Sequence, residues 1–504
     1  MNLADMIEGH VDDRVALISR NRETTYGELR DQVGRLRGGL LGAGVSHGER
    51  VAILCGNNRY FVISYLATIG IGAIAVPLNP SSPAHELEEE LATVSPTTVV
   101  LGPSARSSWD QVDRSKVPSI ERVIIAEGDA EPGTIALADL LNAEPAPLVD
   151  VEPDHLAALI FTSGTAGRSK AAMLSHGNLA ANIEQGHTVA GRTRAGDVVY
   201  GVLPLFHIFG LNVALGVSLS VGATVLLVQR FDPATAVQSI VQRQVTVVPG
   251  APPMWIAFSH FDELPADAFS SVRLPLSGAS RLAPAVADRM EEKFGLSILE
   301  GYGLTEASPV VTNSIDSGRR AGSVGRVLGG QEVRLVGDDG TDVPVGDAGE
   351  IWIKGPNVFL GYWNDQEATD RVLVDGWLHT GDVGVVDEEG FLYLVDRAKD
   401  LIIVSGFNVF PAEVEEVLVT HDAGRRSRRR GGAASARRRG REGVRRPRGR
   451  RHRRRGRTGR PLSRLPRPVQ MPEQDRVRRS PARQRGRQAG AWRARGHHPR
   501  LKRG

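Results

Sequence analysis

Short runs of Val, Ile and Leu alternate with helical patterns along residues 1–395. Residues 60–77 have the pattern of a helix, a Gly72-Ala73 turn and a strand, and residues 208–228 repeat that order around Gly222-Ala223. Other short β-rich runs are residues 156–161, 245–248 and 274–276. Strands without a polar face are typical of parallel sheets that helices cover on both sides. The pattern therefore predicts an α/β fold with two related α/β halves.

Residues 208–228 carry no charge and are long enough to cross a bilayer. Their Gly222-Ala223 turn, however, divides them into a helix and a β-rich strand. Polar side chains also dilute the run, namely Asn212, Ser218, Ser220 and Thr224. We therefore expect a segment of a soluble fold and no membrane span.

The strands become shorter between residues 322 and 393, where Asp-Gly and Gly-Asp turns separate residues 332–336, 350–353 and 391–395. This spacing predicts an antiparallel sheet or a small β-barrel-like part. A new unit begins after Asp396-Arg397, with a strand at 401–404 and a helix at 411–418 whose first residue is a proline. Residues 396–422 therefore read as a hinge and the start of an incomplete α+β C-terminal domain.

The charge divides the chain into two kinds of polypeptide. Residues 425–504 contain 31 arginines and one lysine against three acidic residues, a net charge of +29, whereas the remainder carries −25. Residues 423–504 are mostly Arg, Gly, Ala and Pro without apolar periodicity, so we expect a disordered tail. Such a charge would bind nucleic acid nonspecifically, and with Trp492 as its one aromatic residue the tail offers no row of stacking platforms.

Length and cysteine content narrow the class of protein further. A chain of 504 residues exceeds the size of a single hydrophobic core, so at least two domains or subdomains are expected. One cysteine, Cys55, excludes an internal disulfide framework. Residues 1–10 contain Asp5 and Glu8 where an export signal would be basic, and we expect a cytoplasmic protein.

The segment 161–170, Phe-Thr-Ser-Gly-Thr-Ala-Gly-Arg-Ser-Lys, concentrates glycines and hydroxyls before a lysine. Glycines let backbone N–H groups approach an anion, hydroxyls add donors, and Lys170 adds a mobile charge. The apolar run 156–161 predicts a buried strand that leads into this loop. The spacing differs from a Walker loop, because Gly167 and Lys170 are three positions apart. We predict a nucleoside triphosphate site, with an ordinary surface loop as the alternative.

Four further motifs accompany the glycine loop. They are the aromatic-rich turn 204–210 with His207, the segment Glu300-Gly301-Tyr302-Gly303-Leu304-Thr305-Glu306, the tripeptide Thr380-Gly381-Asp382, and Asp396-Arg397-Ala398-Lys399-Asp400 followed by Ser405-Gly406-Phe407. In this order the five motifs resemble the adenylate-forming superfamily of acyl-CoA synthetases, coumarate-CoA ligases, luciferases and peptide-synthetase adenylation domains. Residues 10–420 carry the resemblance, which is strongest to fatty-acid-CoA ligases.

This resemblance implies that residues 1–395 form an AMP-binding adenylation domain with two α/β sheets and a small β-barrel-like part. The implied reaction joins a carboxylic acid to ATP as acyl-AMP, after which CoA displaces AMP. We expect a medium- or long-chain fatty acid, ATP, Mg²⁺ and CoA as the ligands. An acyl-AMP ligase that delivers to an acyl carrier protein is the alternative.

The resemblance also implies roles for individual residues. Lys170 and the loop residues Thr162, Ser163, Gly164, Thr165 and Gly167 would hold the β- and γ-phosphates, Thr305 the α-phosphate, and Glu306 with Thr165 the Mg²⁺ ion. Tyr302, with Glu300, Gly301 and Gly303 around it, would stack on adenine beside Gly278, Ala279 and Ser280. Asp382 would accept the ribose hydroxyls, Arg397 would bind ribose and phosphate, His207 would line the acyl channel, and Lys399 would be the hinge.

Each of these residues has a purely structural alternative. Tyr302 could be a core residue, Asp382 a turn residue, Arg397 the partner of Asp396 in an ion pair, and His207 a satisfied core histidine. The order of the motifs argues against the first three together. His207, among Phe206, Ile208 and Phe209, stays evenly balanced between the two interpretations.

The chain departs from the family pattern at two places. The loop has Ala166, Ser169 and Ala171 where the family usually has threonine, proline and glycine, which removes one hydroxyl donor worth about 1 kcal/mol. The late Gly-Lys motif of the family's lid domain is missing from the C-terminal sequence, in which Lys502 is the one lysine after Lys399. We hypothesise a shifted reading frame near Gly424, with activity reduced or lost through the missing lid lysine.

Overall fold

The computed structural model of the chain describes residues 1–162, 169–261, 263–397, 402–404, 407–409 and 494–495. The chain divides into two compact units, Met1–Leu401 with Ala491–Gly504, and Ile402–Gly490. In the second unit the described residues form a hairpin of β22 (Ile402–Val404) and β23 (Phe407–Val409). The predicted strand at 401–404 is therefore present as β22. The predicted helix 411–418, the hinge residue Lys399 and all but two residues of the predicted tail lie outside the described residues.

A nine-stranded sheet forms one half of the first unit. Its inner strands are parallel, and its two margins are antiparallel, where β2 pairs with β1 and where β15 pairs with β14 and β16. In sheet order the strands are β16 (Arg326–Val327), β15 (Val310–Asn313), β14 (Leu299–Gly303), β13 (Leu274–Ser277), β12 (Val247–Gly250), β10 (Val198–Gly201), β11 (Thr224–Leu227), β1 (Val15–Ser19) and β2 (Arg22–Thr25). Helices cover the parallel strands, whose residues are mostly buried, as expected for apolar strands without a polar face.

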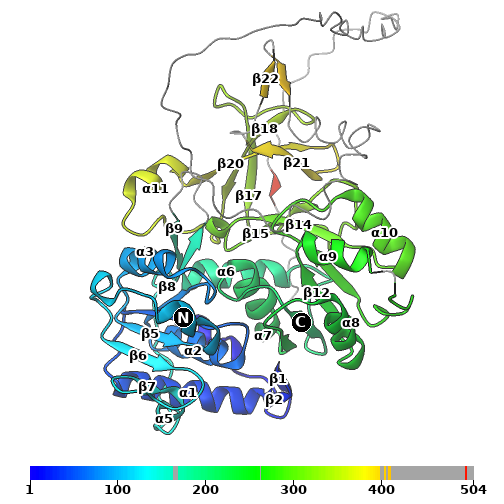
Figure 1. Cartoon of the computed structure of the whole chain (residues 1–504). Helices are drawn as coiled ribbons and strands as arrows, with labels where there is room; N and C mark the ends of the chain where they lie inside the picture. Colours follow the sequence, from blue (N-terminus) through cyan, green and yellow to red (C-terminus); the bar gives the residue numbers. More distant parts are fainter. Residues whose placement is uncertain (163–168, 262, 398–401, 405–406, 410–493, 496–504) are drawn as a thin grey trace, which may run out of the picture. The chain divides into compact units, whose positions relative to one another are not determined.

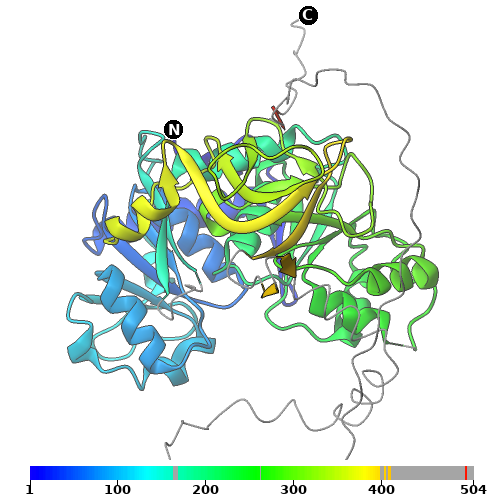
Figure 2. The same cartoon turned by 90° about the horizontal axis from the view of Figure 1, so that it is seen from above.

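A seven-stranded sheet forms the other half. All its neighbouring strands are parallel except the edge pair β8 and β9, which is antiparallel. In sheet order they are β7 (Ile135–Ala136), β6 (Arg122–Ile125), β5 (Thr98–Leu101), β3 (Arg50–Leu54), β4 (Ile74–Pro77), β8 (Leu156–Thr162) and β9 (Lys170–Ser175). In Figure 2 this blue and cyan half lies to the left, and the green helices α9 and α10 of the nine-stranded half lie to the right.

Local sequence explains where the main helices begin. Thr25 and Glu28 form a reciprocal capping box at the start of α1, and Ser175 and Asn178 form one at the start of α6. The α-helices are α1 (Tyr26–Gly42), α2 (Arg59–Gly70), α3 (Ala84–Val94), α4 (Arg106–Trp109), α5 (Leu137–Leu140), α6 (His176–His187), α7 (Val217–Ser220), α8 (Pro233–Gln242), α9 (Pro252–Ser259), α10 (Pro284–Phe294) and α11 (Gln366–Val372). A π-helix, η4 (Phe209–Gly216), precedes α7, and short 3₁₀ turns are η1 (Leu3–Ile7), η2 (Pro103–Ala105), η3 (Arg114–Lys116) and η5 (Thr305–Ala307).

A third, antiparallel sheet follows in the chain and lies at the top of Figure 1. Its strands in order are β19 (Leu373–Val374), β20 (Trp377–Val386), β18 (Ala348–Lys354), β17 (Glu332–Val336) and β24 (Ala494–Arg495), with β21 (Leu392–Arg397) on β20. The predicted antiparallel part between residues 322 and 393 is thus confirmed, and β17 has the predicted bounds. Two residues of the predicted tail, Ala494 and Arg495, pair with β17.

The two repeated helix-and-strand patterns lie in different sheets. Residues 60–77 contain α2 and β4 of the seven-stranded sheet, and residues 208–228 contain η4, α7 and β11 of the nine-stranded sheet. The predicted α/β fold with two halves is therefore confirmed. The strand predicted at 245–248 begins two residues later, because Val245 caps the end of α8 through a hydrogen bond to Ile240. Among the described helices, none has the length and apolar character needed to cross a membrane.

His176 is buried beneath the N-terminal segment. Its Nδ1 accepts a hydrogen bond of 2.9 Å from the backbone N–H of Leu3, and the side chain has no exposed surface. Burial, together with the nearby positive charges of His155, His47 and the N-terminal amine, lowers the pKa of His176 to about 3. The folded chain therefore keeps this imidazole neutral at pH values where the unfolded chain protonates it.

This difference predicts a pH-dependent stability. The contribution of His176 is complete above pH 6.5 and is lost as the pH falls toward 3, by about 1.4 kcal/mol per pH unit. Glu90, whose pKa is raised by burial to about 7, titrates in the opposite sense. The comparison is therefore between the wild type and His176→Gln, both of which keep Glu90. Urea unfolding at pH 7 and pH 5 should show that the stability difference between them narrows by about 2 kcal/mol at the lower pH; a constant difference would contradict a neutral buried His176.

Candidate functional site

A cavity of about 1100 Å³ lies in the first unit, where the carboxyl ends of β12, β13 and β14 face the third sheet. Ligands of open parallel sheets bind at this end of the strands. The cavity is larger than a typical drug-sized pocket, and a nucleotide together with an acid needs such room. Predicted site residues that line it are Thr162, Lys170, His207, Gly278, Ala279, Glu300, Gly301, Tyr302, Gly303, Thr305, Glu306 and Asp382.

The glycine-rich loop connects β8 to β9, as the apolar run before it predicts. Thr162 and Lys170 are register partners at the loop end of this hairpin, and the Thr162 hydroxyl donates to the Lys170 carbonyl at 3.5 Å. The strands thus hold both ends of the loop at the cavity. Ser163, Gly164, Thr165 and Gly167 themselves lie outside the described residues.

Tyr362 connects two of the predicted residues and was missed by the sequence analysis. The Lys170 ammonium lies 4.8 Å from the centre of the Tyr362 ring, and the Tyr362 hydroxyl donates to Glu306 Oε1 at 2.7 Å. The segment around Tyr362 extends the edge of β9, since Ala172 and Tyr362 form a β-bridge. No motif marks this tyrosine in the sequence. The tertiary structure alone brings a lysine, a phenol and a carboxylate into one row.

Buried amide side chains hold the turn that carries Thr305 and Glu306. Asn357, with no exposed surface, donates to the Ala307 carbonyl at 2.8 Å and accepts from Gln185 at 3.0 Å. Asn182 donates to the Val310 carbonyl and accepts from the Val310 N–H, at 2.9 and 3.1 Å. Buried amides with complete partners fix a backbone firmly. Amide side chains spaced three and four residues apart on one face of α6, namely Asn178, Asn182 and Gln185, were the sequence signal that could have revealed this network.

Tyr302 and Asp382 meet directly in the cavity. The Tyr302 hydroxyl donates to Asp382 Oδ2 at 2.8 Å, and burial together with this carboxylate raises the pKa of Tyr302 well above its usual value. Asp382 is held in turn, because its N–H donates to the Thr380 hydroxyl and the Gly381 N–H donates to Glu350. Glu350 lines the cavity and was also missed by the sequence analysis.

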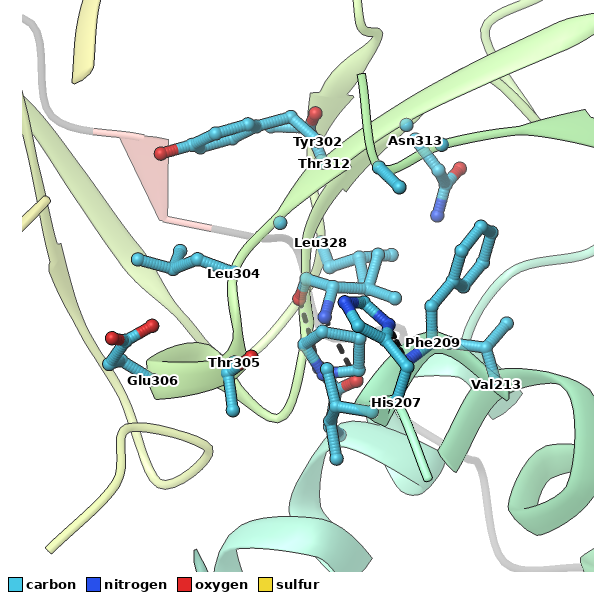
Figure 3. Close-up of a pocket in the computed structure, with 18 of the residues that line it drawn as sticks. His207, Phe209, Val213, Tyr302, Leu304, Thr305, Glu306, Thr312, Asn313 and Leu328 are labelled. Carbon is cyan, nitrogen blue, oxygen red and sulfur yellow. Dashed lines mark hydrogen bonds between the residues drawn. The ribbon is translucent and has the colours of Figure 1, made fainter. Parts of the chain in front are cut away.

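His207 opens into the cavity beside the start of the π-helix η4, and Figure 3 shows it close to Phe209 and Val213. The backbone N–H of Phe209 donates to its Nδ1 at 3.2 Å, so the neutral ring carries its proton on Nε2. Desolvation lowers the pKa of His207, which keeps the ring neutral at physiological pH. His207 is therefore a neutral hydrogen-bond donor toward a guest.

Backbone geometry shapes the polar end of the cavity. Ala279 adopts a φ of 69°, a conformation that residues with a Cβ rarely adopt and that clusters at functional sites. At Gly303 a Cβ would lie 2.1 Å from the Pro309 carbonyl oxygen, so only glycine fits there. Glu300 accepts from the Leu282 N–H, and burial raises its pKa.

The remaining predicted site residues do not all line the cavity. Ser280 is exposed and does not line the cavity. The backbone of Arg397, in β21, pairs in register with Asp382, which brings its Cα to the same edge. The side chain of Arg397, and all of Lys399, lie outside the described residues.

Comparison with known proteins identifies the same family as the sequence motifs do, over residues 4–363. Residues 4–363 match the family model of AMP-binding enzymes. A long-chain-fatty-acid–CoA ligase of Bacillus subtilis (strain 168) is 33% identical over 440 residues, 82% of this chain and 79% of that protein. A feruloyl-CoA synthase of Amycolatopsis sp is 36% identical over 399 residues, 78% and 77% of the two chains.

A solved structure agrees in three dimensions. ATP-bound MatB from Rhodopseudomonas palustris superposes with a TM-score of 0.77 at 33% sequence identity, over 84% of each chain. Sequence, fold and the order of the cavity motifs therefore agree with the resemblance found in the sequence: the chain belongs to the family of AMP-binding enzymes.

Proposed function

We propose that this protein is an acid–CoA ligase that activates a medium- or long-chain fatty acid with ATP, forming acyl-AMP and then the CoA thioester. One observation carries the proposal. Lys170, Glu306, Tyr302, Asp382 and His207 open on a single cavity, whose other walls combine apolar side chains with further polar ones. Three relatives or neighbours named above are a fatty-acid ligase, a feruloyl-CoA synthase and an ATP-bound enzyme, which supports this class of reaction.

The chemistry requires neutralisation of negative charge. A carboxylate oxygen attacks the α-phosphorus of ATP, the bond to the bridging oxygen breaks, and pyrophosphate leaves. Attack brings two anions together, so cations and aligned donors lower the barrier most. In our proposal Lys170 and the loop at 163–168 hold the leaving phosphates, and the Thr305 hydroxyl donates to the α-phosphate. Arg397, on the strand beside Asp382, would add a second cation.

The nucleoside would lie at the other side of the cavity. Asp382 would accept both ribose hydroxyls, and Tyr302 would lie against adenine, with Gly278 and Ala279 as the neighbouring backbone. The Tyr302–Asp382 hydrogen bond supports this assignment, because it orients both groups before the nucleotide enters.

The donor set suits Mg²⁺. Within the described part of the chain, no three His, Cys, Asp or Glu side chains lie close enough to form a protein-only metal site. Mg²⁺ is usually held by one or two carboxylates and by substrate phosphates, which matches Glu306. The hydroxyl of Thr165 would be a further oxygen ligand. When bound, the ion would neutralise charge on the phosphates. Tyr362, by donating to Glu306 Oε1, would orient this carboxylate.

His207 would contact the acid. With its proton on Nε2 it can donate to the carboxylate while remaining uncharged, which positions the nucleophilic oxygen without quenching its charge. In the second half-reaction the CoA thiolate attacks the acyl carbon and AMP leaves. We propose residues 1–395 as the adenylation domain and 396–422 as the hinge and the start of the lid.

Acid-dependent exchange of radiolabelled pyrophosphate into ATP tests the first half-reaction. We expect exchange only when a carboxylic acid is added, followed by thioester formation with CoA. Offering CoA and an acyl carrier protein in parallel identifies the acceptor. Exchange that is independent of acid, or ATP binding without exchange for any acid, would contradict the proposal in this chain.

A further inference from the structure

The cavity has an apolar arm that extends down the face of the nine-stranded sheet. Alternate residues of neighbouring strands line it, Val247 and Pro249 of β12 and Leu274 and Leu276 of β13, before Gly278 at the polar end. Alternation follows from the two-residue period of a strand, so these side chains form rows along one face. The arm therefore extends from the carboxyl ends of the strands to their amino ends.

The arm ends against a group of buried side chains. Leu276, Val213 and Val217 are partly exposed to the cavity, whereas Val199, Val247 and Leu274 have only 1%, 2% and 3% of their surface exposed. The second group, Val199, Val247 and Leu274, therefore forms the buried end of the arm, which we call the floor. These three residues belong to one buried hydrophobic cluster.

One ion pair and four hydrogen bonds to backbone groups hold the loop beside the floor. Arg273 pairs with Asp197 and also donates to the carbonyls of Gly191 and Arg192, at 3.2 and 2.9 Å. The Asp316 carboxylate accepts from the N–H groups of Ala190 and Gly191, at 2.9 and 3.0 Å. Val189 and Thr193 of this loop line the cavity, so fixing the loop also fixes the end of the arm. We therefore expect the floor residues to keep their positions when a longer acyl chain enters the arm.

The length of the arm follows from the strand. Gly278 lies four positions after Leu274, and at about 3.3 Å per position this gives a length of about 13 Å. An extended alkyl chain advances by about 1.3 Å per carbon, because tetrahedral carbons joined by bonds of about 1.5 Å form a zigzag. Resting on the proposed function, we infer that the arm takes a straight acyl chain of about eight to ten carbons and excludes chains of about fourteen or more.

Gly186 is the position that can test this length. It belongs to α6, lines the arm, and a Cβ there would lie 3.8 Å from Val217 Cγ2, an ordinary contact. A larger side chain at 186 can therefore enter the arm without disturbing the helix. Gly42, the last residue of α1, is exposed and has nothing within 4 Å of its Cβ position, so Gly42→Leu is a matched control.

The experiment measures binding of acyl-sulfamoyl-adenosines with four to sixteen carbons by calorimetry, together with acid-dependent exchange. We expect the tightest binding at about eight to ten carbons and at least a tenfold loss at sixteen. Gly186→Leu should move the optimum to about four to six carbons, while Gly42→Leu leaves it unchanged. The calorimetric readout does not depend on the catalytic lid.

Two outcomes would overturn the inference. The first is binding of the sixteen-carbon analogue as tightly as the ten-carbon one, and the second is an unchanged optimum in Gly186→Leu. Failure of every analogue to bind, including the shortest, would instead overturn the proposed function itself. The four-carbon analogue thus separates loss of the nucleotide site from a wrong length for the arm.

Discussion

Replacing Lys170 by alanine will lower acid-dependent ATP–pyrophosphate exchange by about 100- to 1,000-fold, the usual cost of removing one aligned donor from a developing charge. Lys170 is the cation of the glycine loop and lies over the Tyr362 ring at the cavity. Its ammonium would stabilise the leaving pyrophosphate more than bound ATP, so the turnover number should fall more than the affinity for ATP. Exchange kinetics at varied ATP concentrations measure both quantities.

Lys354→Ala provides the matched control for this prediction. Lys354 ends β18, is exposed and does not line the cavity, so its removal changes the net charge equally without touching the site. Its exchange rate should stay within twofold of the wild type. Equal losses in the two variants would show that charge in general, and not the loop lysine, supports the reaction.

Replacing Asp382 by asparagine will raise the Michaelis constant for ATP by about 10- to 100-fold. Hydrogen bonds to a charged group contribute about 1.5–3 kcal/mol each, and every 1.4 kcal/mol is a tenfold change. Asparagine keeps the size of the side chain but carries one acceptor where the carboxylate has two. The Tyr302 hydroxyl can still donate to that oxygen, so the fold should be preserved while ribose loses its partner.

Asp375→Asn is the control in the same sheet. Asp375 lies in the exposed turn between β19 and β20 with a φ of 52°, which asparagine also tolerates. Thermal unfolding of both variants checks that neither loses its structure. An unchanged Michaelis constant in Asp382→Asn, with the wild-type melting temperature, would remove Asp382 from the nucleotide site and leave it as a turn residue.

Signals from neighbouring residues were enough to predict several elements of the fold and the family. The helix-and-strand units at 60–77 and 208–228 follow from apolar runs that end at a glycine turn, which is information carried by neighbouring residues. The antiparallel part followed from closely spaced turns. The position of the glycine loop between β8 and β9 followed from the strand before it. The order of five motifs was sufficient for the family.

Other features depend on contacts that no motif announces. Tyr362 reaches Glu306 across 56 positions, and Asn357 reaches Gln185 across 172. A single tyrosine or asparagine in a loop has no periodic pattern, so the amino-acid sequence carries no local signal for these contacts. Ser280 was predicted as a site residue because it belongs to the same turn as Gly278 and Ala279. Those two residues line the cavity, whereas Ser280 does not.

The amino-acid sequence by itself determined the class of fold, the family and most of the motif residues that line the cavity, because apolar periodicity and short motifs are local properties. The tertiary structure alone decided which of those residues touch, as in the Tyr302–Asp382 pair, and where the apolar arm ends. That end is set by Val199, Val247 and Leu274 of three different strands, and their meeting depends on the order of strands in the sheet. Strand order results from long-range packing, which the alternation of residues along one strand does not encode.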